Sequence, residues 1–163
     1  MPLFGKNWAQ LSPIVDPSAL VPNVRNWRRH PRSQADALTG VLNEVGWVQQ
    51  VMVNKRTGRL VDGHLRVELA IKRHEPTVPV LYVDLSEEEE AKVLVTLDPL
   101  SAMAQPDMDS LLSLLRDTNF QDDAVNAMLE ALANGESLPL RAPVDDPGAD
   151  LDRAEELQTK WKV

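Results

Sequence analysis

The pattern of apolar and polar positions predicts short strands and helices in alternation over the first hundred residues. Residues 11–20 hold the apolar pair Ile14 and Val15 and end near prolines, which indicates a short strand followed by a turn. From Ser33, a favourable amino-terminal cap, apolar residues recur at helical spacing. We expect this helix to end at Gly46, because glycine readily adopts the left-handed conformation that often follows a helix.

The next segment predicts a β-hairpin that leads into a second helix. Residues 47–53 and 59–61 have strand character, and the polar residues 54–58 form the turn between them. An apolar-periodic helix over residues 65–73 and a β-rich stretch over residues 77–83 follow. Pro79 predicts that this last strand is an edge strand or that the proline stands at its start. The order is β-α-β.

A third helix begins after Ser86, because Ser86 and Glu89 match a capping box. The four acids 87–90 favour the positive end of that helix and are assigned a structural role. We expect the helix to stop at Pro99 and a loop to cover residues 101–106.

Two further helices are predicted from their caps and their leucine and methionine stripes. Asp107 caps the first, and Asp122 or Asp123 opens the second, which ends at residues 134–135. Such stripes are typical of a packed helical pair. Proline and aspartate beyond residue 135 predict an acidic linker, and residues 154–163 are expected to form a short terminal helix.

Residues 61–66, Val-Asp-Gly-His-Leu-Arg, carry the most informative chemistry. Gly63 allows a tight turn, and His64 and Arg66 then lie beside the first free N–H groups of a helix, where anions are favoured. This predicts a phosphate pocket. The alternative is purely structural: Asp62 caps the helix, and the two side chains meet only water.

A second basic segment lies between Pro22 and Pro31, with arginines at 25, 28 and 29 and a histidine at 30. Arginine forks suit phosphate oxygens, so Arg28 and His30 are candidates to close over the phosphate pocket. The equally weighted alternative is a solvated basic loop whose Trp27 covers the core.

Charge is divided unevenly along the 163 residues, whose net charge is -8. Residues 1–83 hold 11 Lys and Arg against 6 Asp and Glu, a net of +5, whereas residues 84–163 hold 6 against 19, a net of -13. This fits an anion site confined to the first half rather than a protein that coats DNA.

Composition excludes several classes of function. The chain has no cysteine, so disulfides, thiolate metal sites and a cysteine nucleophile are excluded, and its three histidines lack metal-ligand spacing. We therefore predict no metal site. The first twelve residues do not resemble a signal peptide and no segment is long and apolar enough to span a bilayer, so we expect a cytoplasmic protein without a membrane partner.

Taken in order, these motifs resemble the amino-terminal ParB/sulfiredoxin domain. The resemblance rests on the segments 26–30, 44–47, 62–66, 78–80 and 84–86 together with Ile14 and the Asn54 turn. It implies an α/β (α+β) fold, a small mixed sheet with helices, over residues 11–100. A helical extension over residues 107–135, packed on this domain, and an acidic Pro-rich tail over residues 136–163 would follow.

The resemblance also implies a nucleotide ligand. In this family a Gly-x-x-Arg turn holds the phosphates of CTP in partition proteins and of ATP or ADP in sulfiredoxin and related kinases, with Mg²⁺ as a possible companion, and Gly63, His64 and Arg66 match that turn. Sulfiredoxin activity is excluded because no cysteine is present. Asp98 stands where partition proteins have Asn, and the acidic residues 107–134 do not resemble a DNA-reading helix-turn-helix.

The more specific resemblance is to the ParB-like module of phage and mobile-element proteins that accompanies a DNA methyltransferase. The acidic linker and residues 154–161 resemble the segment before such an enzyme. The chain has neither a Gly-rich cofactor loop nor an Asp/Asn-Pro-Pro-Tyr motif, so we expect an accessory role beside a methyltransferase domain or protein.

Three classes of function stay open. The favoured one is a nucleotide-binding module in DNA modification, partition or phage DNA metabolism, built on Gly63, His64, Arg66, Arg28 and His30. The second is a nuclease or a kinase-like phosphotransferase, with Asp62 or Glu44 as base or magnesium ligand and His64 assisting. The third is a non-catalytic DNA-targeting or assembly module that uses residues 25–32 for backbone contact and predicts strongly salt-dependent binding.

Overall fold

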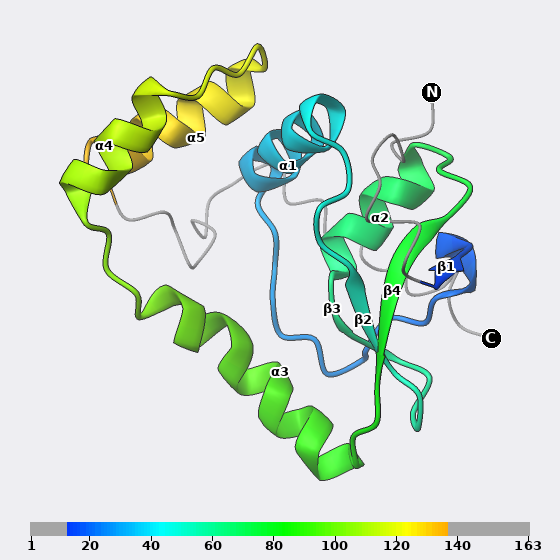
Figure 1. Ribbon diagram of the computed structural model, residues 1–163. Coiled ribbons are helices and arrows are strands. Elements are labelled where there is room, and N and C mark those ends of the chain that lie inside the picture. The colour runs from blue at the N-terminus through cyan, green and yellow to red at the C-terminus, as the bar shows by residue number, and fades with distance from the viewer. Residues whose placement is uncertain (1–12, 137–163) are drawn as a thin grey trace.

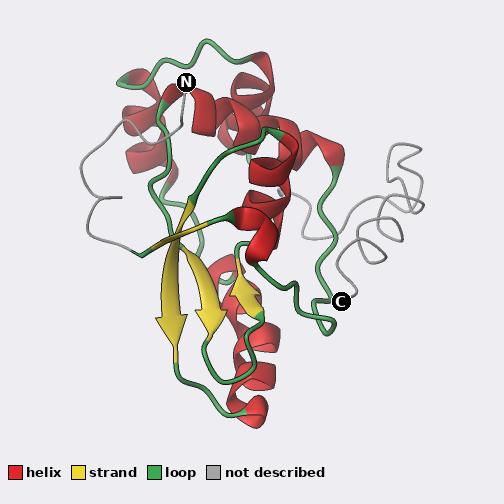
Figure 2. Cartoon of the chain, turned by 90° about the vertical axis from the view of Figure 1, so that its right-hand side faces the viewer, coloured by secondary structure: helices red, strands yellow, loops and turns green. Residues whose placement is uncertain are grey.

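The computed structural model describes residues 13–136, and these residues form one small mixed sheet with helices around it (Figures 1 and 2). The strands are β1 (Ile14–Val15), β2 (Val51–Asn54), β3 (Leu60–Asp62) and β4 (Val78–Val83), in the spatial order β1-β4-β2-β3. β4 is parallel to β2 and antiparallel to β1, and β2 is antiparallel to β3. The predicted α/β class and the β-α-β order are confirmed.

The helices follow the order that the sequence predicts. They are the 3-10 helix η2 (Pro17–Ala19) and the α-helices α1 (Arg32–Glu44), α2 (His64–Lys72), α3 (Glu87–Ala102), α4 (Met108–Arg116) and α5 (Asp123–Ala133). Figure 1 shows α3 leading away from the sheet toward α4 and α5. The strands β2 and β4 are parallel, so the chain must cross over between them, and α2 lies in this crossover connection.

The core lies between the sheet and α2. Strand residues are buried on both faces in β2, β3 and the start of β4, as expected for a sheet covered by helices. Six side chains of the core have no exposed surface: Val51, Leu60, Val61, Val67, Val78 and Val80. The residues that flank Gly63 are therefore held by a rigid, well-packed layer.

Two predicted boundaries near α1 are wrong. The helix begins at Arg32, with Pro31 rather than Ser33 as its cap, because the Pro31 carbonyl already accepts from the N–H groups of Gln34 and Ala35. At its end Gly46 has the expected left-handed conformation, with φ +89°. The following strand begins only at Val51, four residues later than predicted.

Pro79 stands at the second position of β4, so the predicted strand start is correct. The predicted edge position is wrong, because β4 lies between β1 and β2. Pairing with β2 begins at Val80, one residue after the proline. The missing N–H of Pro79 therefore costs no ladder hydrogen bond on that side.

α3 begins with the predicted capping box, in which Ser86 and Glu89 each bond to the other's backbone N–H. It does not end at Pro99 but continues to Ala102. Proline in a helix removes one hydrogen bond, here to the carbonyl of Val95. Val95 lies on the exposed side of α3, where water can satisfy that carbonyl.

The carboxy-terminal helices carry the predicted aspartate caps, Asp107 on α4 and Asp122 on α5. Their packing differs from a simple pair. α5 packs closely on α1 and buries Val125 there, whereas α4 has no buried residue and leaves Leu114 61% exposed. Gly40 of α1 allows this close approach, because a Cβ there would lie 2.7 Å from Val125 Cγ2.

The acidic linker and the terminal helix predicted for residues 154–163 lie outside the described residues. None of the helices between residues 13 and 136 has the length and apolar character needed to cross a membrane.

Candidate functional site

The site is organised by Gly63, which joins β3 to α2. Gly63 is the residue before the first turn of α2 and has φ +93°, a conformation that side-chain-bearing residues rarely adopt. A Cβ at this position would also lie 2.7 Å from Val51 Cγ1 and 3.2 Å from a terminal nitrogen of Arg66. No side chain caps α2, so the predicted capping role of Asp62 does not apply.

Asp62 instead bridges two arginines. Its Oδ1 accepts from Nη1 of Arg28 at 3.2 Å, and its Oδ2 accepts from Nη2 of Arg66 at 2.9 Å. Arg28 arrives from the loop before α1 and Arg66 from the first turn of α2. The side chains of Arg28 and Arg66 are only 12% and 15% exposed, and that of Asp62 is 23% exposed.

Both arginines have further oxygen partners. Arg28 lies 3.0 Å from Asp98 of α3 and also donates to the Val61 carbonyl at 3.2 Å. Arg66 donates to the side chain of Gln49 at 2.9 Å. Two guanidinium groups and the carboxylates of Asp62 and Asp98 thus form a cluster with no net charge.

The charge state of Asp62 follows from these contacts. Burial alone would raise its pKa, but the positive charges of Arg66 and Arg28 and their hydrogen bonds outweigh it, so the pKa lies below its ordinary value. Asp62 is therefore ionised at neutral pH and holds both guanidinium groups in place.

His64 is neutral and has one free nitrogen. Burial, followed by the positive charge of Arg28, lowers its pKa to about 4. Its Nε2 accepts from the backbone N–H of Asn23 at 3.1 Å, so the proton of the neutral ring is on Nδ1. Nδ1 is buried and has no hydrogen-bond partner among residues 13–136.

Two more buried nitrogens of the cluster, the Nε atoms of Arg28 and Arg66, have no hydrogen bond within the described part of the chain. Arg28 Nε lies close to Asp98, but without hydrogen-bond geometry. Unsatisfied buried donors are rare in folded proteins, and their concentration here indicates a place where a ligand could supply acceptors. The first turn of α2 adds N–H groups and the positive end of a helix dipole.

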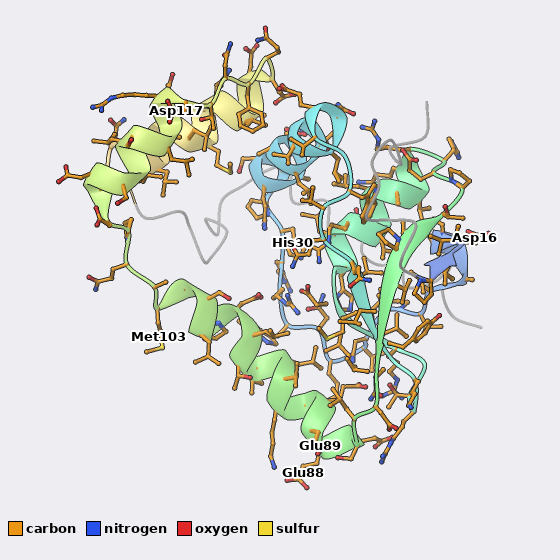
Figure 3. All side chains as sticks on the ribbon, viewed as in Figure 1. Asp16, His30, Glu88, Glu89, Met103 and Asp117 are labelled. Atoms are coloured by element: carbon orange, nitrogen blue, oxygen red, sulfur yellow. The ribbon has the colours of Figure 1, made fainter. Side chains whose placement is uncertain are left out.

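The predicted residues are thus brought together with one exception. Asp62, Gly63, His64, Arg66 and Arg28 form the cluster. His30 lies on the loop before α1 (Figure 3), where its ring contacts the side chain of Gln34 at 3.0 Å.

Glu44 is the exception. Its carboxylate accepts from the N–H groups of Gln121 and Asp122, both at 2.8 Å, where α5 begins. The structure therefore gives Glu44 a part in docking α5 on α1 and does not bring it to Asp62 or His64.

A buried polar network beside the cluster was not predicted from the sequence. Glu90, 3% exposed, accepts from Asn23 and Asn54 at 2.8 and 2.7 Å and from Thr57 at 2.6 Å. Glu90 belongs to the acidic run at the start of α3 and was grouped with its exposed neighbours, whereas Glu88 and Glu89 point outward (Figure 3). The only available signal was its spacing, four residues before the buried Leu94.

Asn23 was also missed. Its backbone N–H positions His64, and its side chain reaches Glu90, so it joins the arginine cluster to the base of α3.

Other arginines of the basic loop face outward. Arg25 and Arg29 are exposed, and no ion pair involves them among residues 13–136. Trp27 between them is 51% exposed, although its Nε1 donates to the Leu94 carbonyl at 2.8 Å. The loop therefore has one arginine turned inward and two turned to solvent.

Metal ligands are not grouped in this part of the chain. Over residues 13–136, no three His, Cys, Asp or Glu side chains are placed to hold one ion.

Comparisons with known proteins address the fold. No protein-family model matches the chain, and no curated protein matches it. Among solved structures, the chain is similar to the C-terminally truncated chromosome-partitioning protein ParB from Caulobacter crescentus, complexed with CTP-γ-S. The TM-score is 0.53 and the sequence identity 18%, and the match covers 77% of this chain and 72% of that chain. A Pnob8-like ParB-N domain matches with a TM-score of 0.47 and 15% identity over 78% and 49% of the two chains. The described residues have a fold similar to that of the amino-terminal domain of ParB.

Proposed function

We propose that this chain binds the phosphate groups of a nucleotide at the cluster formed by Arg28, Arg66, His64 and the first turn of α2. The observation that carries the proposal is the convergence of two partly buried guanidinium groups on a single carboxylate at the uncapped start of a helix. A phosphate offers the same bridging oxygens with more charge.

The two contacts of the Asp62 carboxylate support a specific placement. A phosphate at the position of the Asp62 carboxylate would accept from Arg28 and Arg66, while the Nδ1–H of His64 provides a neutral donor. Gly63, which has no Cβ, lets the start of α2 pack closely against Val51 and Arg66.

The choice of nucleotide follows from the comparison and the resemblance. The ParB structure contains CTP-γ-S, so CTP is the first candidate. ATP is the second, because the sulfiredoxin-like members of the resembling family use it. Mg²⁺ would arrive with the phosphates, since such sites hold it through one or two carboxylates and the phosphate oxygens together.

Catalysis has less support than binding. The Nε2 atom of His64 is engaged by Asn23, and Asp62 is held by two arginines with a lowered pKa, so neither is a strong general base. Glu44 is engaged at α5. A phosphotransferase or nuclease activity would require these groups to be released first.

A second candidate function is contact with the nucleic-acid backbone through the basic loop. It is favoured by the exposed Arg25 and Arg29 on either side of the exposed Trp27. Replacing both arginines with alanine should weaken binding to single-stranded or duplex DNA and reduce its salt dependence. Equal binding by the variant would refute this role.

We also propose, from the resemblance alone, that the protein acts beside a DNA methyltransferase. Co-purification of a methyltransferase with the chain at low salt, and its absence when the tail at residues 136–163 is deleted, would support this partnership.

Isothermal titration calorimetry tests the primary proposal. CTP, ATP and GTP are titrated with and without Mg²⁺ into the unaltered protein, Arg66→Ala and Arg56→Ala. Arg56 is the matched control because it pairs with Asp84 at an exposed position. Saturable binding that Arg66→Ala abolishes and Arg56→Ala preserves is expected. Absence of binding for all three nucleotides would refute the proposal.

A further inference from the structure

Asp62 holds a position that no other carboxylate in the described residues shares. One of its oxygens contacts Arg28 and the other contacts Arg66, so a single side chain bridges the two cations of the site. Among the described residues Asp98 forms an ion pair with Arg28 alone, and its side chain is 41% exposed, so it can turn into solvent. Asp62 is 23% exposed and is fixed at the end of β3.

The charge balance has a direct consequence for any anionic ligand. Arg28 and Arg66 contribute +2, Asp62 and Asp98 contribute -2, and His64 is neutral because its pKa is about 4. An anion that entered with both carboxylates in place would meet no net positive side-chain charge. It would also compete for nitrogens that already donate to carboxylate oxygens.

We propose that Asp62 is a built-in competitor of the ligand and sets the site's specificity: a phosphate group binds by displacing this carboxylate from Arg28 and Arg66. This inference rests on the proposed nucleotide function and adds to it the residue that controls access. A phosphate chain, which carries several charges and bridging oxygens, can replace the carboxylate. A singly charged anion gains too little to do so.

The inference assigns opposite roles to residues of one turn. Arg66 attracts an anionic ligand, whereas Asp62, four residues earlier in the sequence, repels it and occupies the Arg66 guanidinium group. Removing the Asp62 charge while keeping its shape should therefore strengthen ligand binding, which a purely structural Asp62 would not do. If Asp62 instead coordinated Mg²⁺, Asp62→Asn should weaken nucleotide binding, because the bound nucleotide would lose its metal ion.

The test compares the unaltered protein with Asp62→Asn and Asp84→Asn. Asp84 is the matched control, since it is also paired with basic side chains, Lys55 and Arg56, but lies at an exposed position after β4. Inorganic phosphate is added first, and thermal unfolding is followed by circular dichroism. CTP affinity is then measured by calorimetry with Mg²⁺ and with EDTA.

Phosphate should raise the unfolding temperature of Asp62→Asn clearly, and that of the unaltered protein and Asp84→Asn little. CTP should bind Asp62→Asn about tenfold more tightly than the unaltered protein in both Mg²⁺ and EDTA. Should Asp62→Asn be unfolded in plain buffer, folding on addition of phosphate would support the inference, and failure of phosphate to fold it would overturn it.

The inference would be overturned if phosphate stabilised Asp62→Asn no more than it stabilises the unaltered protein. It would also be overturned if the unaltered protein bound CTP in a Mg²⁺-dependent way and Asp62→Asn did not bind CTP. The proposed nucleotide function fails separately, when neither protein binds any nucleotide. In that case the phosphate measurement still decides whether Asp62 occupies an anion position.

Discussion

Replacing Gly63 with alanine tests whether the turn before α2 is as constrained as the structure indicates. Two costs add at this position. An alanine with φ near +93° has the steric strain of a left-handed residue, about 1–2 kcal/mol. The new methyl group also lies 2.7 Å from Val51 Cγ1 and 2.9 Å from Val51 Cβ, and overpacking of this kind costs about 1–3 kcal/mol.

Val51 cannot move aside cheaply, because it has no exposed surface and lies at the start of β2 in the core. The combined loss in the free energy of unfolding should therefore be about 2–5 kcal/mol. The chain supplies its own control in Gly58, which has φ +71° and open space where a Cβ would stand. Gly58→Ala should show the conformational cost alone, about 1–2 kcal/mol.

Urea unfolding followed by tryptophan fluorescence measures both variants, because Trp47 is 3% exposed and reports on the core. The difference between the two losses isolates the contact with Val51. Equal losses in Gly63→Ala and Gly58→Ala would refute the close approach. The same substitution should weaken nucleotide binding, since the methyl group would stand 3.2 Å from Nη2 of Arg66.

Three further predictions concern stability. Folding lowers the pKa of His64 to about 4, so between pH 6.5 and 4 the unfolded chain takes up a proton at His64 more readily than the folded chain does. The free energy of unfolding should therefore decrease by up to about 3 kcal/mol as the pH falls through this range. Urea titrations should show a flatter pH dependence for His64→Gln, and an unchanged pH dependence would contradict the prediction. Gly40→Ala would place a methyl group 2.6 Å from Asp122 Oδ1 and should cost about 1–3 kcal/mol, with faster amide exchange in α5; normal exchange there would argue against the α1–α5 packing. His74 is exposed with φ +55°, so His74→Gly should raise stability by about 0.5–1 kcal/mol, and a lower melting temperature would show that its side chain is needed.

Local signals predicted most of the architecture. The capping box at Ser86, the aspartate caps of α4 and α5 and the left-handed Gly46 each act within a few residues, and all are present. The errors have two different causes. α3 continues through Pro99 because the one hydrogen bond that the proline removes lies on the exposed side of the helix, so the local cost is small. β4 is not an edge strand because it gains a second neighbour from β1, which lies far away in sequence.

The site was predictable only in part, because several of its contacts join residues that lie far apart in sequence. A glycine turn followed by a basic residue is a local motif, so Gly63, His64 and Arg66 could be found from their spacing. The approach of Arg28 to Asp62 spans 34 residues, and that of Asn23 to Glu90 spans 67. No periodicity encodes such pairs, and an acid in a run of four gives little sign that it alone is buried.

The contrast between sequence charge and site charge shows why anion affinity cannot be inferred from composition here. The first half of the chain has a net charge of +5, which suggested an attractive site. In the structure the two inward arginines are matched by Asp62 and by Asp98, and Asp98 comes from the acidic half. Arg25 and Arg29 instead carry positive charge at the surface of the basic loop, and within residues 13–136 no ion pair involves them.

Two separate electrostatic behaviours follow from this arrangement. Binding at the surface of the loop should weaken steeply with salt, because its charges are exposed and screened. Binding at Arg28 and Arg66 should depend less on salt and more on the identity of residue 62, because these groups are largely buried and the competing charge is part of the protein. A salt titration of nucleotide binding in the unaltered protein and in Asp62→Asn therefore separates two effects. Affinity that falls steeply with salt in both proteins indicates attraction by the exposed charges of the basic half. Affinity that depends little on salt but rises in Asp62→Asn indicates that phosphate replaces the Asp62 carboxylate.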